Sequence, residues 1–322
     1  MAETATQVEL DGQYRALREQ AGFLVRERSA LLVSGPDAAE YLQSQLTNDI
    51  EALVPDQGCY AALLDRKGHL VADMRALRLS HSHADQIWMD TEPAAFDALL
   101  KHLETYKIGR EVEVADATPD WTITSLIGPA SVEAAGSPRV SPEHAQDYYE
   151  RDGIRILAVA TDQGIDLITR PDAAETVREG LIAGGAEPVT DAAAEIIRVE
   201  SGRPRFGLDM GPEAMPAEAG IVERAVDFEK GCYIGQEPVA RLHYRGKPNR
   251  RLRGLRLSAP ATQGDPIVLG EREVGTVGTA CISPALGPIA LAIVRREAAD
   301  GQQVMVGNGG VTAELVELPF PT

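Results

Sequence analysis

Two segments of the chain repeat one pattern, an apolar strand that ends in Gly-Pro and leads into a helix. The first runs from Ala30 to Gly35-Pro36, and the second runs from Trp121 to Gly128-Pro129, so the two glycines are 93 residues apart. Glycine suits the tight turn, and proline suits the first turn of the helix that follows. The repeat predicts a duplicated β–turn–α unit rather than a solenoid, whose period is shorter.

The C-terminal region has a different sequence pattern. From Arg251 to Pro319, short β-like runs are separated by glycine and proline, without helical periodicity. That spacing is typical of a small closed antiparallel sheet. A chain of 322 residues has room for two or three domains. We therefore predict an α+β protein made of two related α+β domains, residues 1–117 and 118–249, and a C-terminal β-barrel, residues 250–322.

The charge is strongly acidic, with a formal net charge of −18. Such a chain is a poor general nucleic-acid binder and is repelled by anionic membranes. The longest apolar run, Ile289–Val294, is too short to cross a bilayer. Lys230–Arg256 is the exception, because its eight bases and one acid give +7 and leave −25 for the rest. This segment is either a solvated loop or a local anion site.

Three cysteines, Cys59, Cys232 and Cys281, lie far apart in the sequence. This spacing fits neither a disulfide framework nor a zinc site, and it favours a reducing cytoplasm. His81 and His83 would project from one side of a strand, but no third ligand is spaced nearby. We therefore expect no metal site.

The densest cluster of chemically active residues is Lys230-Gly-Cys-Tyr-Ile-Gly-Gln-Glu237. Cys232 precedes an expected short helix and stands close to Lys230. A helix N-terminus and a nearby cation both lower the pKa of a thiol, which favours a reactive thiolate. The alternative is an inert cysteine packed beside Tyr233. His243 is a candidate base for the thiol, although eleven residues separate the two.

The eight residues from Lys230 to Glu237 resemble the signature of the YgfZ family, folate-binding proteins that support iron–sulfur enzymes. The resemblance implies a three-domain ring with tetrahydrofolate bound near its centre, and it implies iron–sulfur proteins or their assembly factors as partners. Several further stretches are similar to YgfZ or to its relative, the glycine-cleavage T-protein, an aminomethyltransferase. They are Val33–Ala38, Leu46–Asp49, Glu200–Pro204, Gly207–Met210, Pro216–Gly220, Val274–Val277 and Ser283–Leu291.

The resemblance also implies a set of folate-binding residues. Glu200 matches the position expected to accept paired hydrogen bonds from the pterin amide and amine; without the resemblance it would be a solvent-exposed carboxylate at a helix end. Lys230, Arg241 and Arg245 provide positive charge for the anionic glutamyl tail. The remaining candidates are the ring faces of Tyr60 and Tyr233, either of which is otherwise core, and the signature residues Gly235, Gln236 and Glu237.

Asp73 keeps a second activity open. T-proteins usually carry two adjacent aspartates after the hairpin glycine, and one of them is important for methylene transfer. Here the place reads Val71-Ala72-Asp73-Met74, so one carboxylate is retained. Asp73 could orient the folate N5 or N10 atom or transfer a proton.

Three functions are therefore under consideration. The leading hypothesis is a tetrahydrofolate-binding protein that supports iron–sulfur enzymes through the thiol of Cys232. The second is a folate-dependent aminomethyltransferase in which Asp73 is central. The third is a non-enzymatic scaffold whose basic residues Arg250, Arg251 and Arg253 dock an acidic partner.

Overall fold

The computed structural model describes residues 7–80 and 85–321. The chain divides into two compact units. The first contains the described part of Met1–Leu63 together with Ala72–Ala194 and Glu229–Tyr233. The second contains Leu64–Val71, Glu195–Phe228 and the described part of Ile234–Thr322.

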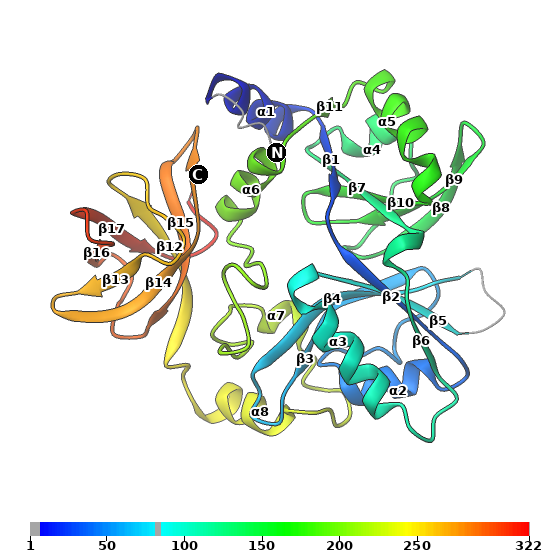
Figure 1. Ribbon diagram of the computed structural model, residues 1–322, viewed down its shortest axis with the longest axis horizontal. Helices are drawn as coiled ribbons and strands as arrows, with labels where there is room; N and C mark the ends of the chain where they lie inside the picture. The colour runs from blue at the N-terminus through cyan, green and yellow to red at the C-terminus, as the bar shows by residue number, and fades with distance from the viewer. Residues whose placement is uncertain (1–6, 81–84, 322) are drawn as a thin grey trace. The chain divides into compact units, whose positions relative to one another are not determined.

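One sheet of the first unit has five strands in the order β3-β4-β5-β2-β6 (Figure 1). Tyr41 of helix α2 is buried and donates its hydroxyl to the Leu103 carbonyl of helix α3 at 2.6 Å. This hydrogen bond links helix α2 to helix α3. The elements are β2 (Ser29–Ser34), α2 (Ala38–Gln45), β3 (Gln57–Leu64), β4 (Leu70–Arg78), β5 (Gln86–Thr91), α3 (Pro93–Tyr106) and β6 (Glu113–Asp116).

The other sheet of the first unit has six strands in the order β11-β1-β7-β10-β9-β8. Its core includes Phe23, Leu126 and Ile165 from the strands and Leu181 from helix α5. The elements are α1 (Gln7–Glu19), β1 (Gly22–Arg26), the 3-10 turn Thr118–Asp120, β7 (Thr122–Ile127), α4 (Ser131–Ala135), β8 (Gln146–Arg151), β9 (Ile154–Ala160), β10 (Gly164–Thr169), the 3-10 turn Pro171–Ala173, α5 (Ala174–Ala183) and β11 (Glu187–Pro188).

The two sheets have the same strand plan. The order β3-β4-β5-β2-β6 in one corresponds to β8-β9-β10-β7-β1 in the other, and Gly-Pro follows both β2 and β7. Gly35 has φ +123°, and a Cβ there would lie 2.2 Å from the Glu111 carbonyl oxygen. Gly128 has φ +120°, and a Cβ there would lie 2.5 Å from the Gln20 carbonyl oxygen. Both turns therefore require glycine, which confirms the predicted duplication.

The two sheets pack face to face through a shared apolar cluster. Leu77 and Trp88 come from the five-stranded sheet, and Ile123, Leu157 and Ile168 come from the other. This packing buries one face of each sheet within the first unit.

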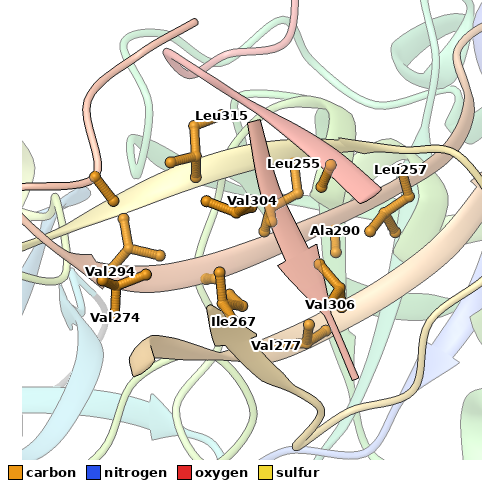
Figure 2. Close-up of a cluster of buried hydrophobic side chains, with 13 residues drawn as sticks. Leu255, Leu257, Ile267, Val274, Val277, Ala290, Val294, Val304, Val306 and Leu315 are labelled. Carbon is orange, nitrogen blue, oxygen red and sulfur yellow. The ribbon is translucent and has the colours of Figure 1, made fainter. Parts of the chain in front are cut away.

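The second unit contains the predicted barrel, a closed sheet in the order β12-β15-β14-β13-β16-β17. Its interior is filled by aliphatic side chains such as Leu255, Ile267, Val294 and Leu315 (Figure 2). The strands are β12 (Arg250–Leu257), β13 (Pro266–Leu269), β14 (Arg272–Ser283), β15 (Gly287–Arg295), β16 (Gln303–Val306) and β17 (Val311–Val316). The helices with residues in this unit are α6 (Asp191–Glu200), α7 (Val222–Ala225) and α8 (Gln236–Arg245).

The predicted fold class, α+β with a C-terminal antiparallel barrel, is confirmed. The N-terminal strand β1, which follows helix α1, was not predicted, and it pairs with β7 of the six-stranded sheet. The proposed boundaries at residues 117 and 249 stay predictions. Among residues 7–80 and 85–321, no helix is long and apolar enough to cross a membrane.

Candidate functional site

The hairpin of β3 and β4 brings two predicted site residues, Tyr60 and Asp73, together. Its turn is closed by Gly68, which has φ +81° and whose amide donates to the Asp65 carbonyl at 3.0 Å. The Tyr60 hydroxyl donates to Asp73 Oδ2 at 2.7 Å. Asp73 is buried, and its other oxygen, Oδ1, has no hydrogen-bond partner among the described residues. An unpaired oxygen on a buried carboxyl group indicates a site where a ligand binds or where the carboxyl group holds a proton.

The surroundings of Asp73 raise its pKa above the ordinary value for an aspartic acid. Burial is the largest cause, because a charged carboxylate loses its hydration. The Tyr60 hydroxyl and the Arg28 guanidinium oppose this effect, whereas the carboxylate of Glu92 adds to it. Asp73 therefore holds its proton to higher pH than an exposed aspartate, which suits a group that donates and accepts a proton near N–H groups of a ligand.

A buried network of charged side chains lies near Asp73, between the two sheets. Arg28 donates to Asp90 Oδ1 at 2.7 Å and to Glu92 Oε1 at 2.5 Å. Arg75 donates to Asp90 Oδ2 at 2.8 Å and to Asp166 Oδ2 at 2.7 Å. Burial alone would raise the pKa of Asp90, but Arg75 and Arg28 outweigh it and hold that pKa below its usual range.

Sequence reasoning missed this network. The sequence did contain a signal for it. Asp73 and Arg75 are two residues apart on the apolar strand β4. Asp90 and Glu92 are likewise two residues apart around the end of the apolar strand β5. Residues two apart in a strand share a face. Four charged residues on the inner faces of two neighbouring strands would have marked a buried polar site.

In the signature segment, Lys230–Glu237, the ammonium group of Lys230 has different partners from the ones we expected. The residue is buried, and its ammonium donates to the carbonyls of Gln43 at 2.7 Å, Leu46 at 2.6 Å and Asn48 at 2.8 Å. Three contacts occupy the three protons of the ammonium group. Lys230 thus connects the signature to the end of helix α2 and the loop after it, and these contacts do not support the expected role as a ligand for the glutamyl tail.

The three cysteines differ in accessibility. Cys232 is exposed, so the alternative of a buried, inert cysteine at this position was wrong. Burial raises the pKa of Cys59 to about 12 and that of Cys281 to about 12. Next to Cys232, Tyr233 is buried with its ring 5.3 Å from the Lys230 ammonium, and burial raises its pKa to about 12.

The rest of the signature begins helix α8. Gly235 has φ +82°, and a Cβ there would lie 2.4 Å from the Asp65 carbonyl oxygen, so glycine is required at this junction with the hairpin turn. Gln236 opens the helix, and Glu237 forms an exposed ion pair with Arg241 at 2.9 Å. His243, the candidate base, stacks on Phe228 with ring centroids 3.9 Å apart.

Glu200 ends helix α6, as predicted, but it is not exposed. Its carboxylate is buried, and Oε1 accepts a hydrogen bond from the hydroxyl of Ser283, a buried residue of β14. The Glu200 carbonyl accepts from the amide of Phe320 at 3.0 Å. The barrel therefore fixes this carboxylate, and the alternative of a solvated helix-end residue was wrong.

The second unit also carries a depression of about 640 Å³ between the loop 207–213 and strands β14 and β15. None of the predicted folate-binding residues lines it. No group of three or more His, Cys, Asp or Glu residues within the described ranges could hold a metal ion. His81 and His83 lie outside the described residues.

Two family models match the chain. The model of the GCVT N-terminal domain matches residues 3–230, and the model of the glycine cleavage T-protein C-terminal barrel domain matches residues 250–321. Together they cover both sheets and the barrel.

Individual proteins agree with these matches. The chain is 28% identical to an aminomethyltransferase of Rubrobacter xylanophilus over 97% of its own length and 86% of the relative. It is also 28% identical to a chloroplastic protein of Arabidopsis thaliana that is named as a transferase, over 89% of this chain and 68% of that protein. The crystal structure of the glycine cleavage system aminomethyltransferase T from Bartonella henselae superposes with a TM-score of 0.85 at 22% identity, covering 97% of this chain and 89% of that one, so the fold is shared.

Proposed function

Because the chain belongs to the glycine cleavage T-protein family, we propose that it binds tetrahydrofolate and, following the resemblance of Lys230–Glu237 to the YgfZ signature, that it supports iron–sulfur enzymes through the thiol of Cys232. The observation that carries the folate part is the carboxyl group of Asp73, whose Oδ1 is buried without a partner in the described part of the chain. Leaving such an atom unpaired costs about 1–3 kcal/mol. A ligand N–H group at Oδ1 removes that cost.

The chemistry of reduced folate fits this carboxyl group. Bound tetrahydrofolate supplies ring and side-chain nitrogens that carry one-carbon units. Asp73 is held in one orientation by the Tyr60 hydroxyl at 2.7 Å, and its raised pKa lets it give or take a proton at such a nitrogen. Glu200, fixed by Ser283, is proposed as the acceptor of the pterin amide and amine, and Arg241 as a cation for the glutamyl tail.

The thiol part of the proposal rests on Cys232. It is exposed, whereas Cys59 and Cys281 are shielded and have pKa values of about 12. A thiol must be accessible and must ionise to react with sulfur or with a metal cluster, so Cys232 is the cysteine suited to meet a partner. We propose iron–sulfur proteins or their assembly factors as these partners, in the reducing cytoplasm.

Calorimetric titration with tetrahydrofolate under anaerobic, reducing conditions tests the folate part. We expect one saturable site with a Kd on the order of micromolar. Asp73→Asn should weaken binding by about tenfold, the loss of one hydrogen bond to a charged group. Asp97→Asn, which alters an exposed aspartate of α3, is the matched control and should bind as the parent does. The absence of saturable binding by the parent protein would overturn the folate proposal.

The thiol part needs its own experiment. In cells that depend on this protein, Cys232→Ala should lower the activities of iron–sulfur enzymes while leaving tetrahydrofolate binding intact. Cys281→Ala is the matched control because that thiol is shielded. Unchanged iron–sulfur enzyme activities with Cys232→Ala would contradict the role of the thiol.

Aminomethyl transfer to tetrahydrofolate is the second candidate. The retained Asp73 and the relatives named as aminomethyltransferases favour it. It ranks second because Ala72, in the place of a T-protein aspartate, is fully buried beside Met74 and offers no carboxylate. Formation of methylene-tetrahydrofolate from an aminomethyl-lipoyl carrier protein, lost in Asp73→Asn, would place this activity first.

A further inference from the structure

Helix α8 presents an unusual surface for so acidic a protein. Arg241, Tyr244, Arg245 and Lys247 are exposed on the helix and on the segment after it, and Tyr244 is 66% exposed. Arg241 pairs with Glu237, whereas Arg245 and Lys247 form no ion pair within the described chain. We call these four residues the α8 surface.

Aromatic rings stiffen this surface. His243 lies nearly parallel to Phe228, with centroids 3.9 Å apart, and the Tyr244 ring stands edge-on to both, at 5.9 Å from Phe228 and 4.8 Å from His243. Rings held in this way lose little entropy when a partner binds. Exposed tyrosine beside arginine is the composition of strong contact points in protein interfaces.

The distribution of charge along the chain indicates the charge of the partner. Lys230–Arg256 carries +7 against −25 for the rest of the chain, so an acidic partner is repelled elsewhere and steered to this segment. A long nucleic acid fits less well, because its binding needs many neutralised phosphates and this surface offers three cations.

Two of the three arginines considered from the sequence are engaged in ion pairs. Arg250 pairs with Glu218 at 2.8 Å, and Arg253 pairs with Asp300 at 2.6 Å. The third, Arg251, is half-buried on β12. The docking residues considered from the sequence therefore shift from these strand residues to the exposed residues of helix α8.

From these observations we infer that the α8 surface docks an acidic polypeptide, whose carboxylates meet Arg241, Arg245 and Lys247 while one of its apolar side chains packs on Tyr244. Arg241 is shared with the proposed glutamyl-tail site, whereas Tyr244, Arg245 and Lys247 are not part of that proposal.

A fluorescein-labelled oligoglutamate peptide carrying one tryptophan is the probe, and its anisotropy is followed as full-length protein is added. We expect saturable binding that weakens as salt rises. The double variant Arg245→Glu/Lys247→Glu should weaken it by about tenfold or more, and Tyr244→Ser by about fivefold. Arg272→Glu, an exposed arginine of the β13–β14 hairpin, is the matched control and should change it by less than about twofold.

Three results would overturn the inference. The first is that the peptide does not bind at low salt. The second is that an oligouridylate of equal charge binds as tightly, which would make the surface a site for nucleic acid. The third is that tetrahydrofolate triglutamate displaces the peptide while the monoglutamate does not, which would assign these cations to the folate tail.

Discussion

The Tyr60 hydroxyl donates to one oxygen of Asp73 at 2.7 Å, and the other oxygen of that buried carboxyl group has no partner within residues 7–80 and 85–321. This asymmetric arrangement fixes the direction of the carboxyl group and leaves one side for a ligand. The burial of this carboxyl group also affects the stability of the free protein, and that effect can be measured without any ligand.

We predict that Asp73→Asn stabilises the free protein near neutral pH. The pKa of Asp73 is raised in the folded state by burial, so its contribution to stability is complete below the unfolded pKa and is lost as pH rises through the folded pKa. Asparagine has no charge to bury, and the gain should be about 1 kcal/mol. Urea unfolding at several pH values measures it; a gain that failed to shrink in acid would contradict this origin.

The thiols should react in two classes. We expect Ellman's reagent to modify Cys232 at once in the native protein, whereas Cys59 and Cys281, with pKa values of about 12, react at least about a hundredfold more slowly. In urea all three should react together. Cys232→Ser should remove the fast phase alone, and a fast phase that survives this change would mean that another cysteine is accessible.

Ser283→Ala should destabilise the protein by about 1–3 kcal/mol, because it leaves the buried carboxylate of Glu200 without this donor. Thermal unfolding gives the comparison. Ser201→Ala is a matched control, since it removes a hydroxyl that donates to the carbonyl of Ile197 rather than to a charge. Equal losses from the two substitutions would show that the charge of Glu200 is not what Ser283 supports.

These cases show what the sequence could predict. The two Gly-Pro turns were recognisable because their requirement is local: Gly35 and Gly128 each meet a backbone carbonyl at positive φ. Helix α6, Asp191–Glu200, likewise ends at Glu200, the residue that the sequence analysis places at a helix end. Short-range periodicity and turn chemistry account for both.

The burial of charged residues could not be predicted in the same way. Ser283, the partner of Glu200, is 83 residues away, and Leu46, a partner of Lys230, is 184 residues away. No local pattern reports such pairs. Strand β1 was missed for the same reason, because its pairing with β7 depends on the tertiary fold.

Arg75 gives the sharpest test of the network between the sheets. Arg75→Met should destabilise the protein by about 3–5 kcal/mol at neutral pH, because it leaves Asp90 and Asp166 without a buried cation that both contact. Arg178→Met, which breaks an exposed pair with Glu175, should cost less than about 0.5 kcal/mol.

The pH dependence of this loss identifies its cause. The pKa of Asp90 is lowered in the folded state, so its contribution is present above the unfolded pKa and disappears as pH falls through the folded pKa. Arg75 is a main cause of that lowering. The difference in unfolding free energy between the parent protein and Arg75→Met should therefore shrink as the pH falls below about 4, the unfolded pKa of an aspartate. A difference that stayed constant as the pH fell well below that value would mean that Arg75 stabilises the sheets by packing its side chain rather than by its charge.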